Sequence, residues 1–175
     1  MQVSLKKVTL ETLPELQVIS KTTFQETFAH LNTEENMIRY LNDRFGIRKL
    51  EEEVLNENSI FYIAEIQDSI IGYLKVNFND AQTENMIPNT MEIERIYVAS
   101  SYYGEGVGQL LFEKALQLAQ DHGMSCIWLG VWEHNPRAIR FYEKNGFKTF
   151  DKHVFQLGDE AQTDFLMRLD LMPSN

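Results

Sequence analysis

The segment Tyr103-Gly104-Glu105-Gly106-Val107-Gly108-Gln109 has the residue types and spacing of an anion-binding turn. It follows an apolar, strand-like run and opens a segment with helical spacing, so its backbone N–H groups lie at a helix N-terminus. Glycines there let the main chain approach a bulky phosphate without a Cβ in the way. We expect this turn to bind a pyrophosphate group, although a glycine-rich strand-to-helix turn that binds no ligand can have the same residues.

The spacing separates this turn from two common phosphate-binding motifs. A dinucleotide fingerprint, G-x-G-x-x-G, requires glycine where Gln109 stands. A P-loop requires Gly-Lys-Ser/Thr, which this sequence lacks. The motif is therefore of a different kind.

A second constellation begins at Asn135, which is followed by Pro136. Asparagine is a favoured helix N-cap, and proline is favoured as the first helical residue. Tyr142 follows Ala138 and Ile139 by four and three positions, so it shares the apolar face of this helix. Taken alone, Tyr142 is best interpreted as a core tyrosine.

Apolar periodicity and turn residues predict the elements that position these two constellations. We expect helices over residues 13–29, 48–55, 107–122 and 136–144, and a further helix that begins at a cap at Asn32 or Thr33 and continues through Leu41. We expect strands over residues 3–8, 61–66, 70–76, 91–98, 126–132, 147–155 and 163–171. Strands 91–98 and 126–132 are joined through one helix, so they run parallel with a right-handed crossover.

Composition narrows the classes of function. The chain has 175 residues, which fits one domain, and 26 acidic against 16 basic residues give a net charge of −10. This balance disfavours nucleic acid as a partner and favours cationic ones, although it can also serve solubility alone. No apolar run approaches the roughly 20 residues of a membrane helix, and the single cysteine, Cys126, lies in an apolar run as a core thiol. We expect a cytoplasmic protein, and no metal, because no His/Cys cluster has ligand spacing.

Together the two constellations resemble the GNAT superfamily of acetyl-CoA-dependent N-acetyltransferases over roughly residues 60 to 155. The residues that carry the resemblance are Glu94-Arg95-Ile96-Tyr97-Val98, Gly104-Glu105-Gly106-Val107-Gly108, Asn135, and Ala138-Ile139-Arg140-Phe141-Tyr142-Glu143-Lys144-Asn145-Gly146-Phe147. Segments 24–28, 128–133 and 155–167 look like the bacterial PaiA-type branch, whose members are known for acetylating spermidine and spermine. The family's glycine motif usually begins with Gln or Arg, where this chain has Tyr103.

The resemblance implies a single domain over 1–175 with a mixed α/β (α+β) fold. Its strongly twisted sheet would have two splayed, parallel central strands and flanking helices. Pantetheine would lie in the slot between these strands and pair with the backbone of Ile96 to Val98. The implied cofactor-binding residues are Ile96, Tyr97, Val98, Tyr103, Gly104, Glu105, Gly106, Val107, Gly108, Gln109, Asn135 and Tyr142.

The implied chemistry is direct attack by an amine on acetyl-CoA in a ternary complex. A lysine-like amine has a pKa of about 10.4, so a base must remove a proton; we expect Glu94, with Glu133, Glu26 and His30 as alternatives. A backbone N–H near Tyr97 or Val98 would stabilise the oxyanion. By the resemblance, Tyr142 would donate a proton to the departing sulfur.

Three functions stay open at this point. The leading one is acetylation of a small primary amine, a polyamine such as spermidine or spermine. The second is acetylation of a protein amine, either a lysine or an N-terminus. The third is a non-catalytic acetyl-CoA sensor, against which Tyr142 argues, because a binding module needs no acid beside the sulfur. A homodimer is compatible with each.

Overall fold

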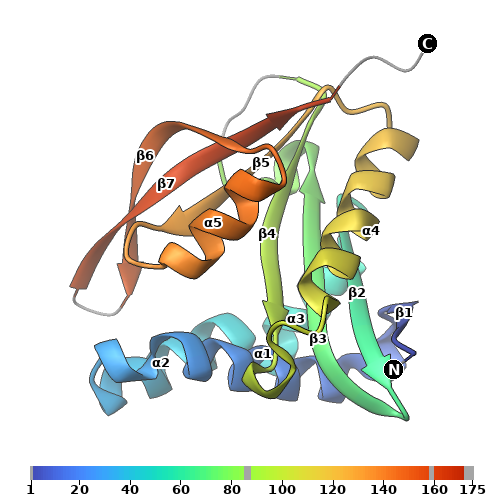
Figure 1. Cartoon of the computed structure of the whole chain (residues 1–175). Coiled ribbons are helices and arrows are strands. Elements are labelled where there is room, and N and C mark those ends of the chain that lie inside the picture. Colours follow the sequence, from blue (N-terminus) through green and yellow to red (C-terminus); the bar gives the residue numbers. More distant parts are fainter. Residues whose placement is uncertain (1, 85–87, 158–159, 172–175) are drawn as a thin grey trace.

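The computed structural model describes residues 2–84, 88–157 and 160–171. Within these residues the strands form one seven-stranded mixed sheet, in the order β1-β2-β3-β4-β5-β7-β6 (Figure 1). The strands are β1 (Ser4–Lys7), β2 (Ser59–Ile66), β3 (Ser69–Phe78), β4 (Thr90–Val98), β5 (Cys126–Trp132), β6 (Lys148–Leu157) and β7 (Glu160–Asp170). The predicted mixed α/β fold is therefore confirmed, with β1 at one edge of the sheet as expected.

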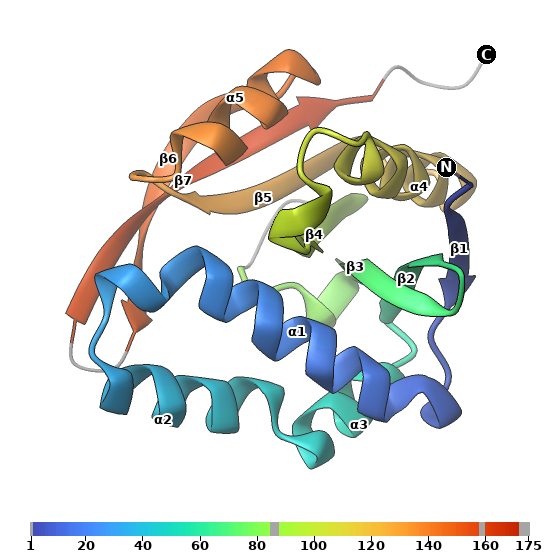
Figure 2. The ribbon, with the colours of Figure 1, turned by 60° about the horizontal axis from the view of Figure 1, so that its bottom comes forward.

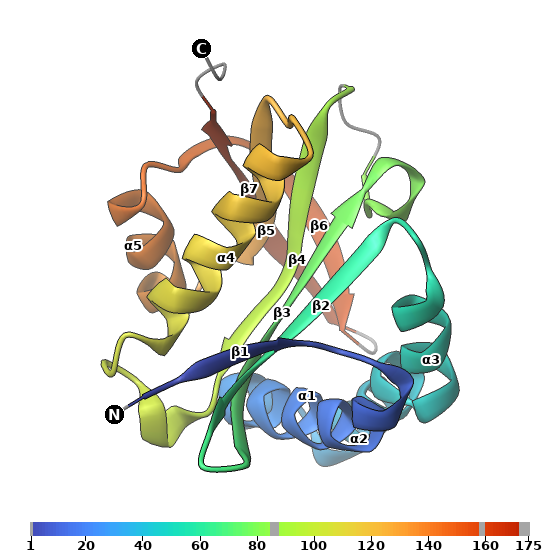
Figure 3. The ribbon, with the colours of Figure 1, turned by 90° about the vertical axis from the view of Figure 1, so that its right-hand side faces the viewer.

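Helices cover both faces of the sheet and enclose two hydrophobic cores. They are α1 (Leu13–Phe28), α2 (Glu34–Phe45), α3 (Ile47–Leu55), α4 (Val107–Asp121) and α5 (Pro136–Lys144), with short 3₁₀ turns at Leu10–Thr12, Ala29–Leu31, Asn79–Ala81 and Ser100–Tyr102. Figure 3 shows α1 to α3 on one side of the first four strands and α4 on the other. One core lies under α1 to α3, and the other under α4 and α5.

The helix ends follow the predicted local chemistry. The Thr33 side chain accepts a hydrogen bond from Asn36 N at 3.2 Å and so caps α2. Asn135 Oδ1 accepts from Ala138 N at 3.2 Å and caps α5. Gly123 follows α4 with φ of +67°, a left-handed conformation that favours glycine after a helix.

The predicted strands 61–66 and 70–76 are confirmed as parts of β2 and β3, which form an antiparallel hairpin. Its two turn residues, Gln67 and Asp68, both have positive φ values, of 46° and 65°. Two such residues in succession match the twist of a right-handed β-ribbon. The Asp68 side chain is short and polar, which makes the left-handed conformation tolerable.

The parallel pair β4 and β5 separates after a short stretch of pairing. The register runs from Thr90 opposite Cys126 only to Glu92 opposite Trp128. Beyond that point β4 continues beside β3, and β5 continues beside β7, so the two strands diverge (Figure 1). The register of β4 against β3 shifts at the same place, because Lys75 pairs with Arg95 and Val76 with Ile93, which leaves Glu94 as the extra residue of a β-bulge.

Several element boundaries differ from the expectation; for example, α2 continues to Phe45 rather than ending at Leu41, and β3 continues to Phe78. β7 begins at Glu160 rather than Thr163, because its ladder with β6 extends to the pair Leu157 and Glu160. Residues 158–159, between the predicted strands 147–155 and 163–171, and residues 85–87, between the predicted strands 70–76 and 91–98, lie outside the described residues. Among the helices that the structure describes, none is long and apolar enough to cross a membrane.

Candidate active site

A cavity of about 540 Å³ occupies the space where β4 and β5 diverge. Strands β4 and β5 supply lining residues, and α1, α2, α5, β6 and β7 contribute the remaining walls. In Figure 2, α1 and α2 lie below β4 and β5. Much of the wall is aromatic, from Phe24, Phe28, Tyr40, Phe45, Tyr97 and Trp132.

The cavity brings together five of the residues predicted for the site. Its lining includes Glu94, Ile96, Tyr97, Asn135 and Tyr142, which come from β4 and α5. Segments far apart in the sequence therefore meet at one place, as the two-part motif requires.

The glycine turn and Val98 lie outside this lining but next to its wall. A Cβ added to Gly108 would lie 3.9 Å from Phe141 of α5 and 3.9 Å from Val98 of β4. The turn thus packs between the end of β4 and the helix that carries Tyr142. A long ligand that bound at the turn could continue along β4 into the cavity.

The glycine turn fits the diphosphate that the sequence predicts. Gly104 and Gly106 have φ of +82° and +80°, and a Cβ at either position would meet nothing within 4 Å, so the space beside them is open. The first hydrogen bond of α4 runs from Leu110 N to Gly106 O at 3.1 Å, so the N–H groups of residues 107–109 precede it. Unpaired N–H groups at a helix N-terminus bind anions.

A cation also lies at this turn. The guanidinium carbon of Arg137, in the first turn of α5, is 3.4 Å from the centroid of the Tyr103 ring. Such stacking fixes a planar, permanently charged group beside the turn. The Tyr103 ring therefore holds a side-chain donor, the Arg137 guanidinium of α5, beside the turn.

Tyr142 is buried at the cavity wall, with 7 % of its surface exposed. Its ring packs edge-on against Phe147 at 5.6 Å between centroids. Burial raises the pKa of the Tyr142 hydroxyl above its usual value, so the phenol stays protonated at neutral pH. Asn135 uses its Oδ1 as the cap of α5, which leaves its amide N–H₂ group as a donor toward the cavity.

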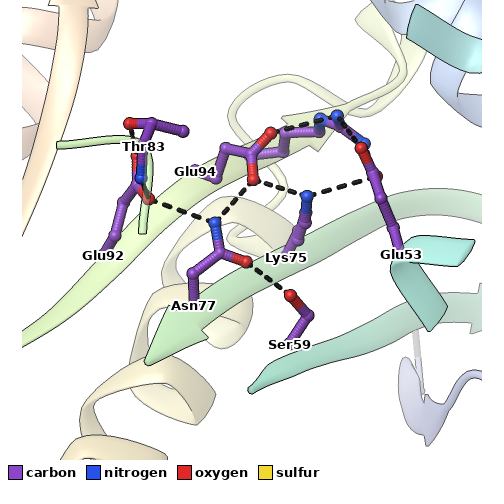
Figure 4. A network of polar contacts seen from close by, with 8 residues as sticks. Glu53, Ser59, Lys75, Asn77, Thr83, Glu92 and Glu94 are labelled. Carbon is purple, nitrogen blue, oxygen red and sulfur yellow. Dashed lines mark hydrogen bonds and ion pairs between the residues drawn. The ribbon is translucent and has the colours of Figure 1, made fainter. Parts of the chain in front are cut away.

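Glu94, the expected general base, is held in a buried network of charges (Figure 4). Its carboxylate lies 2.5 Å from Lys75 Nζ and 3.0 Å from an Arg95 guanidinium nitrogen, and it accepts a hydrogen bond from Asn77 at 2.6 Å. Glu53 of α3 completes the network, with oxygens 2.8 Å from Arg95 and 3.1 Å from Lys75.

This network sets the acidity of Glu94. Burial alone would raise the pKa of its carboxyl, but the cations Arg95 and Lys75 and the Asn77 amide lower it to about 2. A carboxylate of such low pKa is a weak proton acceptor at neutral pH. The geometry of Glu94 therefore offers no support for the expected role as base.

The alternative bases lie outside the cavity lining. Both carboxylate oxygens of Glu26 accept hydrogen bonds at 2.8 Å, from the N–H and hydroxyl of Ser100, and so hold the turn after β4. His30 is exposed in the 3₁₀ turn after α1. Glu133 follows β5, and its backbone N–H donates to Thr163 O at 3.0 Å.

Sequence reasoning missed two polar residues of β7 that line the cavity, Gln162 and Asp164. Burial raises the pKa of the Asp164 carboxyl to about 6, with a smaller lowering by His153 and a smaller raising by Glu133. The sequence predicts the alternation of side chains along β7. It does not predict that the part of β7 around Asp164 pairs with the carboxyl end of β5. Only that pairing, Asp164 opposite Trp132, brings Asp164 to the cavity.

The described residues contain no group of three or more His, Cys, Asp and Glu side chains that could hold a metal ion. Cys126 is buried, and burial raises the pKa of its thiol. A buried thiol of raised pKa is a poor nucleophile, so the interpretation of Cys126 as a core residue is confirmed.

Comparison with known proteins identifies relatives of this architecture. Residues 17–147 match the family described as Acetyltransferase (GNAT) family. An uncharacterized N-acetyltransferase from the pepI 3′ region of Lactobacillus delbrueckii subsp. lactis is 41% identical over 170 residues, which cover 97% of this chain and 98% of the relative. A spermidine N(1)-acetyltransferase of Thermoplasma acidophilum is 25% identical over 155 residues, covering 86% and 91%.

A solved structure shares the fold. The PaiA N-acetyltransferase from Thermoplasma acidophilum, crystallised in complex with coenzyme A, superimposes with a TM-score of 0.81 at 23% identity, covering 98% of this chain and all of that one. The sheet order and the diverging parallel pair thus belong to a fold already seen with a coenzyme.

Proposed function

This chain belongs to the GNAT family of acetyltransferases and uses acetyl-CoA, and from that premise we propose that it acetylates a primary amine of a polyamine such as spermidine or spermine. The acetyl group would pass directly to the amine while both substrates are bound. The observation that carries the proposal is one cavity, at the divergence of β4 and β5, whose wall contains both Asn135 and the protonated phenol of Tyr142.

The cofactor would lie along β4 and end at the glycine turn. The edge of β4 that faces β5 is released from pairing after Glu92, so the backbone of Ile96 to Val98 is available to an added, extended chain. The Asn135 amide group would hold a pantetheine amide. The N–H groups of residues 107–109 would bind the diphosphate, with the Arg137 guanidinium as an additional donor, whereas the N–H groups of Tyr103 and Glu105 already donate to Ser100 O and Tyr102 O within the turn.

Acetyl-CoA supplies an activated acyl group, and the residues of this chain would donate a proton and stabilise the negative charge that develops during transfer. Tyr142 would donate a proton to the sulfur as the C–S bond breaks; burial keeps its phenol protonated at neutral pH, although the raised pKa also makes it a weaker acid than free tyrosine. A backbone N–H of Tyr97 or Val98 would stabilise negative charge on the carbonyl oxygen. Glu94 lines the same cavity, but its ion pairs with Lys75 and Arg95 favour a structural role for it over proton transfer.

The composition of the wall favours a cationic, partly apolar acceptor. Aromatic faces attract ammonium groups, and alkyl segments between those groups pack on the same rings. Carboxylates of Glu84, Glu92 and Asp164 line the same space. The net charge of −10 would steer polycations toward the molecule. The distant relative named as a spermidine acetyltransferase agrees with this class of substrate.

The test of this proposal compares acceptors at equal concentration. We expect CoA release from acetyl-CoA, followed by thiol detection, to rise with spermidine and spermine and to stay near background with lysine-containing and N-terminal peptides. Faster turnover with the peptides would contradict the polyamine assignment while leaving the acetyltransferase chemistry intact.

The role of Tyr142 is tested by Tyr142→Phe, which removes one hydroxyl from the cavity wall. We expect kcat to fall by about 100-fold or more, the usual range for loss of a general acid, while acetyl-CoA affinity by calorimetry stays within about twofold. Tyr62→Phe removes the same group from β2, outside the cavity lining, and serves as the matched control. Equal kcat for both variants would refute the assigned acid.

A further inference from the structure

Asp164 lies on the cavity wall between two other strands. It is opposite Trp132 of β5 and opposite His153 of β6 in the register of the sheet. Residues directly opposite each other on antiparallel strands point to the same face. Trp132, His153 and Asp164 accordingly all line the cavity.

Two oxygen atoms of this wall have no partner. Asp164 Oδ1 and Gln162 Oε1 are buried, and among the described residues neither has a hydrogen-bond donor. The two residues are two positions apart on β7, so their side chains share a face. A buried acceptor without a donor costs free energy, and two of them on one cavity wall indicate that a ligand supplies the donors.

A glycine of β5 adjoins Asp164 at the cavity wall. Gly130 of β5 stands beside it, and a Cβ there would lie 3.5 Å from Asp164 Oδ2. Gly130 is flanked by Leu129 and Val131, both buried. Gly130 and Asp164 therefore lie within contact distance of each other, and both line the cavity.

The other carboxylates of the lining are occupied. Glu94 is held by Lys75, Arg95 and Asn77. Glu92 accepts hydrogen bonds from both the N–H, at 2.8 Å, and the hydroxyl, at 2.5 Å, of Thr83. The Glu84 carboxylate contacts the His153 ring. Within the described part of the lining, Asp164 alone keeps a buried carboxylate oxygen without a donor.

An alkylammonium group is the complementary ligand. It carries three N–H donors and no acceptor, whereas the Asp164 and Gln162 oxygens are acceptors. Taking the proposed acetyl transfer as its basis, we propose that Asp164 binds the ammonium group of the acceptor and removes its proton, with Gln162 as the second hydrogen-bond acceptor.

The proton balance of this step is complete. The ammonium N–H bond breaks, its proton goes to the Asp164 carboxylate and then to water, and the freed lone pair forms the N–C bond with the acetyl carbon. The C–S bond breaks with its electron pair on sulfur, which takes a proton from Tyr142. The nitrogen loses a second proton as the amide forms, and that proton restores the phenol, so the net reaction releases one proton.

The environment of Asp164 suits a base. Burial raises the pKa of its carboxyl to about 6, so it is ionised at pH 7 to 8 but more basic than an ordinary aspartate. The titratable and charged groups around it are His153 on β6, Glu133 after β5, Glu84, and Tyr40 and Arg44 on α2.

The experiment measures kcat/KM for spermidine from pH 5 to 9 in the wild type, Asp164→Asn and Asp170→Asn. Asp170 is an exposed aspartate of the same strand, so its variant is the matched control. We expect the wild type to show an acidic limb with an apparent pKa near 6. Asp164→Asn should lose that limb and about 100-fold or more of kcat/KM at pH 7.5, with acetyl-CoA affinity within about twofold.

Four further outcomes decide the proposal. Asp164→Glu should keep an acidic limb, which a purely structural role would not predict. His153→Asn should also keep it, and loss of the limb in that variant would assign the titration to His153 and overturn the inference. If the wild type is active and Asp164→Asn has the same turnover and the same pH profile, the inference about Asp164 is wrong while the proposed function stands. If the wild-type protein turns over no amine, both the proposed function and this inference are wrong.

Discussion

Two carboxylates on one cavity wall have opposite environments. Glu94 is surrounded by Lys75, Arg95 and Asn77, and the pKa of its carboxyl is lowered to about 2. No described residue donates a hydrogen bond to the buried Oδ1 of Asp164, and the pKa of this carboxyl is raised to about 6. The difference arises from their neighbours, because both residues are partly buried and acidic.

This contrast separates structural charge from reactive charge. A carboxylate whose partners are all within the protein stabilises the fold and has little affinity left for a proton. A carboxylate without partners destabilises the folded state and is available to a substrate. We therefore assign the two residues to different tasks, although the sequence alone favoured Glu94 as the base.

The largest expected effect comes from removing a cation of the Glu94 network. Lys75 is 4 % exposed and contacts both Glu94 and Glu53, so Lys75→Met leaves two buried carboxylates with Arg95 as the remaining cation of the described network. Loss of one partner from a buried ion pair costs about 3–5 kcal/mol. Urea unfolding at pH 7 should show that loss.

Lys6→Met is the matched control for this prediction. Lys6 also pairs with a glutamate, Glu65, but its side chain is 56 % exposed. An exposed pair contributes about 0–1 kcal/mol, so this variant should unfold close to the wild type. Similar losses in Lys75→Met and Lys6→Met would show that burial of the Glu94 network contributes nothing.

A smaller effect is expected when Glu94 itself is neutralised. Glu94→Gln keeps oxygen and size but leaves Lys75 and Arg95 to Glu53 alone, so we expect a loss of about 2 kcal/mol in unfolding free energy. Because the kcat/KM of a base variant falls by about 10²–10⁴, a fall below about tenfold in the folded enzyme would exclude Glu94 as the base. A fall in the larger range would return that role to it.

The same variant has a pH signature. The folded pKa of Glu94, about 2, lies below the ordinary value of 4.5, so its stabilisation is complete above pH 4.5 and disappears as pH falls toward 2. Glu94→Gln should therefore lose less stability than the wild type between pH 5 and pH 3. Parallel stability curves would contradict the assigned partners.

The sequence predicted the helices, strands and turns around this site better than the contacts of its charged side chains. Buried positions such as Leu16 and Phe24 of α1 recur with helical spacing, and Asn135 before Pro136 marks a helix start by local chemistry. The glycines at 104 and 106 likewise act through their own backbone, with positive φ. These features depend on residues close together in the chain.

The charges depend on residues far apart. Glu53 and Arg95 are 42 positions apart, and nothing in either segment indicates that they meet. The bulge at Glu94 arises from the register of β4 against β3, which no single strand encodes. Asp164 reaches the cavity through a pairing of β7 with β5, so periodicity could place its face but not its neighbours.

The smallest predicted effect, a gain in stability, opposes that of Glu94. The folded pKa of Asp164, about 6, lies above the ordinary 3.8, so the folded state holds this proton more tightly and stability falls as pH rises through that window. Asp164→Asn removes the charge and should stabilise the protein by about 1 kcal/mol at pH 7.5, or about 2–4 °C in Tm, with little gain at pH 4.

Thermal unfolding by circular dichroism at both pH values measures this gain. Asp170→Asn, on the same strand but exposed, should change Tm little at either pH. We expect Asp164→Asn to raise Tm and to lose turnover. This combination is typical of an active-site carboxylate that destabilises the fold but is needed for catalysis. A loss of stability at pH 7.5 would instead mean that the Asp164 carboxylate already has partners in the folded protein, and the contrast with Glu94 would then collapse.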